Sequence, residues 1–102
     1  MPGWILRSAG DLPVTLRLAA GSIKTLGRTA RADFIVDAAL ISRIHCRLTA
    51  DASDQLLVED LGSTNGTLVN GSRIDRAVLK TGDTLQVGRV TFTVFSDEAY
   101  AD

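Results

Sequence analysis

Three polar residues interrupt an apolar segment in the first half of the chain. Ser42, Arg43 and His45 lie within LISRIHCRL, residues 40–48, which otherwise begins and ends like a buried strand. A polar group that is buried without a partner costs stability, so these side chains require partners or a ligand. Two chemistries suit them. Ser42 and His45 could act as a nucleophile and its base, or the hydroxyl and the guanidinium could bind an anion.

Two other segments carry polar residues that a strand pattern does not require. One is the short loop over residues 27–31, and the other lies within DLGSTNGTLVNG, residues 60–71. Together with residues 38–45 they make three polar loops between short apolar runs. Binding residues tend to lie on loops that a rigid scaffold positions. We therefore expect the three loops to be the functional part of the chain.

Short strands and regular turns account for the remaining segments. Turn residues recur at spacings of about ten residues, and the runs between them alternate apolar and polar side chains, as in residues 14–18 and 46–49. Asn70 and Gly71, flanked by TLV and SRI, are typical of a type I′ hairpin because both residues tolerate a positive φ. The pattern predicts a β-sandwich or a β-barrel.

The composition is that of one globular domain. The chain has 102 residues, with a hydrophobic content of 45% and a charged content of 23%, which are ordinary values for such a domain. No apolar run approaches the length of a membrane span, and the single Cys46 excludes an intrachain disulfide and a multi-cysteine metal site. We expect an intracellular, cytoplasmic protein, or a nuclear one if its source is eukaryotic.

Charge is unevenly distributed along the chain. The net charge is −1, yet residues 1–50 carry seven Arg and Lys against three Asp, a net charge of +4. Residues 51–102 carry four Arg and Lys against nine Asp and Glu, a net charge of −5. A basic half could contact a nucleic acid or a phosphorylated partner. The chain as a whole is not basic enough for a dedicated nucleic-acid binder.

Four motifs, in this order, resemble the forkhead-associated (FHA) domain family. They are LGR at 26–28, ADFIVDAALISRIHCRL at 32–48, VEDLGSTNGTLVNG at 58–71 and LKTGDTLQVG at 79–88. The resemblance implies an all-β fold, a β-sandwich of about eleven strands in two sheets with the binding loops at one end. We expect residues 1–102 to form a single FHA domain, with a core over about 4–95 and an acidic, flexible tail over 96–102.

The resemblance also implies a phosphothreonine-peptide site on the three loops. Arg28 and Ser42 would contact the phosphate, as a charged planar fork and a short hydroxyl donor. Thr64 would add a side-chain or backbone contact beside them. Asn65 would hold the peptide main chain, because an amide both donates and accepts. Arg43 would either contact the phosphate or brace its loop.

Three further residues would support this site. The resemblance gives His45 a scaffolding role, in which it hydrogen-bonds the loops, and Gly27 and Gly66 shape the backbone around it. Asp60 is expected to bond loop amides. The structural role of His45 is favoured over a catalytic one, because the sequence lacks a nucleophile-elbow pattern and a small sandwich has little room for a substrate cleft.

One position departs from the family pattern. Some FHA domains carry a basic residue two positions before the loop serine, where it helps to select the peptide, but this chain has Leu40 there. The selected residue could therefore be apolar on that side. Arg31 and Arg47 could supply charge nearby, although the sequence does not show which way they point.

The resemblance to FHA domains implies a non-enzymatic module that binds a phosphothreonine-containing substrate of a Ser/Thr kinase. We expect no cofactor, no metal, no nucleic acid and no membrane partner, and a monomeric isolated domain. One alternative is an FHA-fold scaffold that makes phosphate-independent contacts or self-associates. A hydrolase centred on Ser42 and His45 would show turnover, and a nucleic-acid binder would show steeply salt-dependent binding to unrelated sequences.

Overall fold

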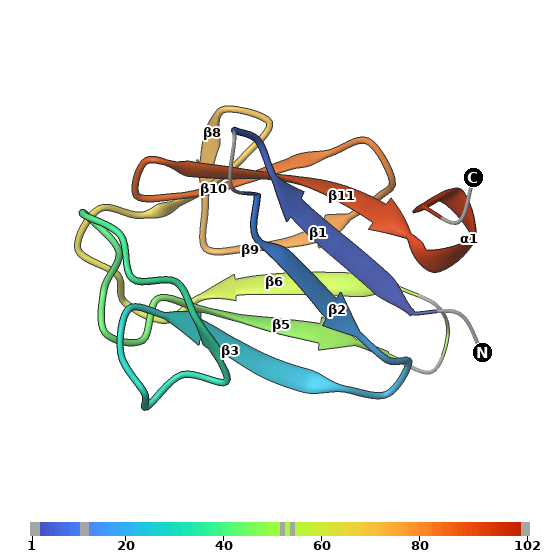
Figure 1. Cartoon of the computed structure of the whole chain (residues 1–102), viewed down its shortest axis with the longest axis horizontal. Coiled ribbons are helices and arrows are strands. Elements are labelled where there is room, and N and C mark those ends of the chain that lie inside the picture. The colour runs from blue at the N-terminus through green and yellow to red at the C-terminus, as the bar shows by residue number, and fades with distance from the viewer. Residues whose placement is uncertain (1–2, 11–12, 52, 54, 101–102) are drawn as a thin grey trace.

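The computed structural model of the chain describes residues 3–10, 13–51, 53 and 55–100, and within them eleven strands and one short helix (Figure 1). In chain order the elements are β1 (Trp4–Ser8), β2 (Thr15–Leu18), β3 (Ile23–Gly27), β4 (Phe34–Ile35), β5 (Cys46–Ala50), β6 (Leu56–Asp60), β7 (Thr67–Val69), β8 (Ser72–Ile74), β9 (Arg76–Leu79), β10 (Thr84–Val87), β11 (Val90–Ser96) and α1 (Asp97–Tyr100).

The strands form two sheets that pack face to face. One sheet has six strands in the order β2-β1-β11-β10-β7-β8, and the other has five in the order β4-β3-β5-β6-β9. The pairings are antiparallel except that of β3 with the two-residue β4, which is parallel. The predicted all-β sandwich of eleven strands in two sheets is confirmed.

The core is built from alternate positions of the strands. Leu48 in β5 and Val58 in β6 are fully buried and lie opposite each other across the ladder. Leu6, Leu85 and Phe92 from the six-stranded sheet are equally buried and belong to the same apolar cluster. Full burial of such a side chain contributes about 1.5–3 kcal/mol, so this cluster is the rigid base from which the loops project.

The turn between β7 and β8 has the predicted geometry. Asn70 has a φ of 51° and Gly71 a φ of 84°, and a type I′ turn requires positive φ at both central residues. The Asn70 side chain also holds the turn against β10, because its Oδ1 accepts the backbone N–H of Thr84 at 2.9 Å. The hairpin prediction is confirmed, and the turn is tied to β10.

Part of the expected tail over 96–102 has secondary structure. Ser96 is the last residue of β11 and pairs with Trp4 of β1, and Asp97–Tyr100 form one helical turn. Two hydrogen bonds hold this turn, since Asp97 N–H donates to the Gly3 carbonyl at 2.9 Å and Ala99 N–H donates to Ser96 Oγ at 3.2 Å. Residues 101–102 of the expected tail lie outside the described residues. Among the described residues there is no helix that could cross a membrane.

Candidate functional site

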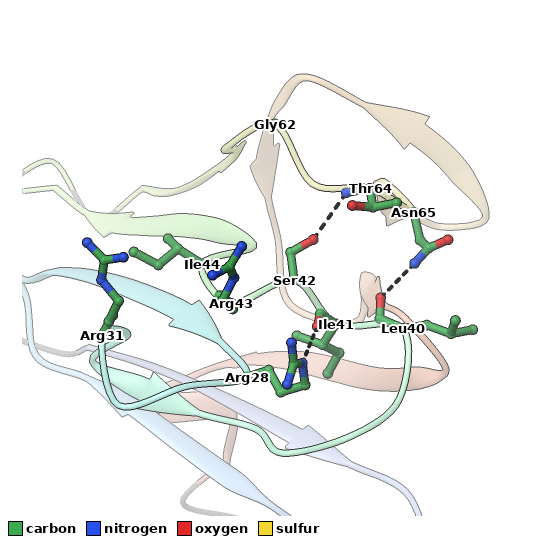
Figure 2. Close-up of a pocket in the computed structure, with 10 residues that line it drawn as sticks. All are labelled: Arg28, Arg31, Leu40, Ile41, Ser42, Arg43, Ile44, Gly62, Thr64 and Asn65. Atoms are coloured by element: carbon green, nitrogen blue, oxygen red, sulfur yellow. Dashed lines mark hydrogen bonds between the residues drawn. The ribbon is translucent and has the colours of Figure 1, made fainter.

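The three polar loops meet at the end of the sandwich opposite α1 (Figure 1). They enclose an open cleft of about 710 Å³. The connection from β3 to β4, the connection from β4 to β5 and the connection from β6 to β7 each contribute to its walls (Figure 2). The residues that line the cleft are Arg28, Arg31, Leu40, Ile41, Ser42, Arg43, Ile44, Gly62, Thr64 and Asn65.

Arg28 is held in the cleft by two hydrogen bonds to the neighbouring loop. Its backbone N–H donates to the Ser42 carbonyl at 3.0 Å, and its Nε donates to the Ile41 carbonyl at 3.0 Å. The Nε bond fixes the plane of the guanidinium, and no described residue accepts from its terminal nitrogens. Two N–H donor groups of a permanent cation are therefore oriented in advance for an anion.

Ser42, Thr64 and Asn65 form the opposite wall. The Thr64 N–H donates to Ser42 Oγ at 3.1 Å, which orients the hydroxyl and leaves its own proton to donate elsewhere. Asn65 Nδ2 donates to the Leu40 carbonyl at 3.1 Å, and Leu40 has a φ of 69°, a conformation that is uncommon for a residue with a side chain. Thr64, Asn65 and Leu40 are all exposed, so this wall offers polar and apolar contacts to a ligand.

His45 lies beneath the cleft with its ring fully buried. Its Nδ1 accepts the backbone N–H of Ser42 at 3.1 Å, so the proton is on Nε2, which donates to the Gly66 carbonyl at 2.8 Å. The ring thus joins the loop that carries Ser42 to the loop that carries Asn65. Ser42 Oγ is bonded to Thr64 and not to the imidazole, so His45 is not placed as a base for that hydroxyl.

Replacing His45 with alanine should lower the free energy of unfolding by about 1–3 kcal/mol, because Ser42 N–H and Gly66 C=O lose their buried partner. Urea unfolding measures the change. Arg43→Ala is the matched control, since this neighbouring side chain is exposed and should change the stability by no more than about 0.5 kcal/mol. Equal stability of His45→Ala and Arg43→Ala would contradict the supporting role of the ring.

A second network shapes the loop between β6 and β7. Asp60 Oδ2 accepts the backbone N–H groups of Gly62 and Ser63, each at 3.1 Å, and Oδ1 accepts the hydroxyls of Ser63 and Thr67. Ser63 Oγ in turn accepts the Gly66 N–H at 2.9 Å. Partial burial raises the pKa of Asp60, but the hydrogen bonds from Ser63 and Thr67 outweigh it and hold the pKa below its usual value.

Ser63 and Thr67 were not selected from the sequence, although both are buried polar residues. The spacing of Asp60 and Ser63, with Gly62 between them, is the local signal of a side chain that caps its own turn. Bonding of loop amides by Asp60 was expected, and the structure shows it.

The depressed pKa of Asp60 makes part of the stability depend on pH. A carboxyl whose pKa is lowered by folding stabilises the fold above its unfolded value of about 3.9, and this contribution is lost as pH falls through the folded pKa. At neutral pH Asp60→Asn should therefore be less stable than the wild type by about 1–3 kcal/mol. The difference should shrink below about pH 4. Urea unfolding across pH tests this, with Asp37→Asn as the control, and a pH-independent difference would contradict it.

Gly27 allows two loops to approach closely. A Cβ at this position would overlap the carbonyl oxygen of Arg43 and lie 2.9 Å from the Cα of Ile44. Gly66 has a φ of 87°, and a Cβ there would meet the Arg73 side chain at 2.7 Å. Gly27 directly precedes Arg28 and Gly66 directly follows Asn65. Both were expected to shape the backbone of the site, and a Cβ at either position would meet a neighbouring group.

The remaining arginines of this region differ in their placement. Arg47 does not line the cleft and forms an ion pair with Glu59, with Nη2 and Oε1 3.2 Å apart. Arg31 and Arg43 line the cleft and are exposed. Among the described residues no group of three His, Cys, Asp or Glu side chains is arranged to hold a metal ion.

Comparison with known proteins identifies a family whose model covers the three loops of the cleft. The family model of the FHA domain matches residues 24–88. The glycogen accumulation regulator GarA of Mycobacterium tuberculosis is 37% identical over 68 residues, which are 67% of this chain and 41% of GarA. The chain therefore spans less than half the length of this curated relative.

Solved structures agree with this match over nearly the whole chain. The FHA domain of the CT664 protein from Chlamydia trachomatis has a TM-score of 0.84 and 25% identity, and the match covers 90% of this chain and 95% of that one. EmbR of Mycobacterium tuberculosis, solved in complex with a low-affinity phosphopeptide, has a TM-score of 0.79 and 27% identity, and the match covers 90% of this chain and 24% of EmbR.

Proposed function

Because the chain belongs to the FHA domain family, we propose that its cleft binds a phosphothreonine peptide through Arg28, Ser42, Thr64 and Asn65. The module mediates a phosphorylation-dependent protein–protein interaction downstream of a Ser/Thr kinase. The observation that carries the proposal is the position of Arg28 and Ser42, whose free donors line one cleft.

The chemistry of the cleft suits a phosphate monoester. Such a group carries about −1.5 to −2 charges at neutral pH and three acceptor oxygens. The guanidinium of Arg28 supplies charge and paired donors, and the hydroxyl of Ser42 supplies one more. Asn65 keeps its Oδ1 for a main-chain N–H of the peptide, since its Nδ2 is bonded to Leu40. Arg43 is exposed on the same cleft and adds to its positive charge.

The protein acts by binding and not by catalysis. The buried His45 and the bond from Thr64 to Ser42 Oγ leave the hydroxyl without a base, which disfavours a hydrolase. We propose that residues 1–102 form one FHA domain with its core over about 4–95, that the isolated domain is monomeric and that it acts inside the cell on a kinase substrate. The complex of EmbR with a phosphopeptide supports this type of partner.

Four versions of one peptide test the proposed function. The peptide carries phosphothreonine, phosphoserine, glutamate or unmodified threonine at the same position, and its affinity is measured by fluorescence anisotropy at one salt concentration. FHA-like sites hold the threonine γ-methyl in a small apolar notch, and one methyl in such a pocket is worth about 1–3 kcal/mol, so phosphoserine should bind about 10- to 200-fold more weakly.

Glutamate should bind more weakly still. It has one charge, two planar oxygens and no γ-methyl, so it cannot meet Arg28 and Ser42 in a tetrahedral arrangement. Unmodified threonine should not bind measurably. Equal affinity for phosphothreonine and phosphoserine would show that the cleft recognises charge alone, and equal affinity for the unmodified peptide would favour a phosphate-independent module of the same fold.

A further inference from the structure

We propose that Arg31, together with Arg43, forms a second anion subsite in the same cleft. The natural partner would then carry a second acidic group, a carboxylate or a second phosphate, near its phosphothreonine. This inference rests on the proposed function and specifies the class of peptide that the site selects.

Arg31 lines the cleft and lies on the turn that follows β3. Ala32 N–H donates to the Thr29 carbonyl at 3.0 Å, and Thr29 Oγ1 donates to the Arg43 carbonyl at 3.3 Å, which ties this turn to the loop that holds Ser42. Ala32 is buried and anchors the turn, whereas Arg31 is exposed. Figure 2 shows Arg31 and Arg43 on one side of Ser42, and Leu40 and Asn65 on the other.

The guanidinium groups of Arg31 and Arg43 are uncommitted. Within the described part of the chain, neither has a hydrogen bond or an ion pair, whereas Arg28 donates from Nε to Ile41 and Arg47 pairs with Glu59. An arginine that lacks a partner beside a binding site is available to a ligand. The Arg31 side chain therefore does not brace its loop, and the residue lines the cleft in which a peptide would bind.

No acidic side chain neutralises this side of the cleft. None of the ten described residues that line it is Asp or Glu. Asp33, two residues after Arg31, accepts the backbone N–H of Thr25 at 2.8 Å and its hydroxyl at 3.1 Å. These hydrogen bonds hold the Asp33 carboxylate against β3.

One phosphate does not satisfy three arginines. The phosphothreonine group carries at most two charges, and the fixed Arg28 and the Ser42 hydroxyl are sufficient to bind it. With a single phosphate on the peptide, Arg31 and Arg43 would remain without a counter-charge, since no described residue that lines the cleft is Asp or Glu. A second anion on the peptide would supply that counter-charge and form charge-assisted hydrogen bonds with the guanidinium groups.

A double-mutant cycle between peptide and protein tests the subsite. The parent peptide has one phosphothreonine flanked by alanines. Each flanking position is changed in turn to glutamate, and the best position is then changed to phosphoserine. Affinities for the wild type, Arg31→Gln and Arg76→Gln are measured by fluorescence anisotropy at one salt concentration. Arg76 is the matched control, because it is an exposed arginine of β9 that does not line the cleft.

At one or two flanking positions glutamate should raise the wild-type affinity about 3- to 10-fold, as expected for a charge pair at a partly solvated interface. Phosphoserine at that position should raise it further if the preferred group is a second phosphate. If the subsite prefers a carboxylate, phosphoserine should gain no more than glutamate. Arg31→Gln should abolish most of the gain, and Arg76→Gln should keep it.

Two other results would overturn the inference. If no position favours glutamate, or if Arg31→Gln retains the full gain, the second subsite does not exist, while binding of the parent peptide would leave the proposed function intact. If the wild type binds neither the parent nor any glutamate peptide, the proposed function and the inference both fail.

Discussion

Replacing Arg28 with alanine is expected to weaken binding of a phosphothreonine peptide by about 2–5 kcal/mol, because the phosphate loses a cationic donor in a partly desolvated site. Ser42→Ala should also weaken binding, but by less, since the hydroxyl carries no charge. Titration calorimetry measures both changes. A melting curve of each variant separates loss of a contact from loss of the fold.

Arg76→Ala controls for the loss of one positive charge that does not line the cleft, and it should bind like the wild type apart from a small electrostatic effect. Both site variants should keep their folded structure, because the Arg28 side chain makes one hydrogen bond and the Ser42 hydroxyl accepts one from an exposed loop. Unchanged affinity in Arg28→Ala and Ser42→Ala would show that the phosphate binds elsewhere.

The second large effect concerns the backbone beside Arg28. Gly27→Ala is expected to lower the free energy of unfolding by about 3 kcal/mol, because overpacking against a rigid neighbour is costly. The new Cβ would overlap the Arg43 carbonyl. The neighbouring atoms all belong to the backbone, so the clash cannot be relieved by rotating a side chain. The end of β3 would have to separate from the loop that carries Ser42, so the same variant should also bind the peptide more weakly.

Gly82→Ala is the matched control for this experiment. Gly82 has a φ of 93° and open space around the position of a Cβ, so its substitution costs only the left-handed conformation, about 1–2 kcal/mol. Urea unfolding of both variants should rank Gly27→Ala as the less stable one. The reverse order would show that the approach of the two loops can relax without cost.

Much of the fold could be predicted from the sequence because the informative signals are local. Alternation of apolar residues, as in residues 46–49, identifies strands with one buried face, and Asn70 with Gly71 identifies a hairpin through the backbone conformations that these residues tolerate. The order of the four motifs indicated the FHA family, and the family match over residues 24–88 confirms it. The strand and hairpin signals do not depend on distant parts of the chain.

Other features depend on contacts that no local pattern contains. The turn that carries Arg31 is tied by Thr29 to a loop fourteen residues away, and Arg47, which does not line the cleft, pairs with Glu59 on the adjacent strand. The helical turn after β11 forms because Asp97 reaches the carbonyl of Gly3 at the other end of the sequence. For these residues the sequence gives the chemical type, and only the packed structure gives the partner.

The central claim is that a phosphothreonine peptide binds across the three loops at this end of the sandwich. A titration of the ¹⁵N-labelled protein followed by two-dimensional NMR tests it most directly, because each backbone N–H reports its own position. Addition of the peptide should shift the amides of residues 27–31, 40–45 and 62–66, and the unphosphorylated peptide should not. Shifts confined to the outer faces of the sheets, or identical shifts with both peptides, would contradict the claim.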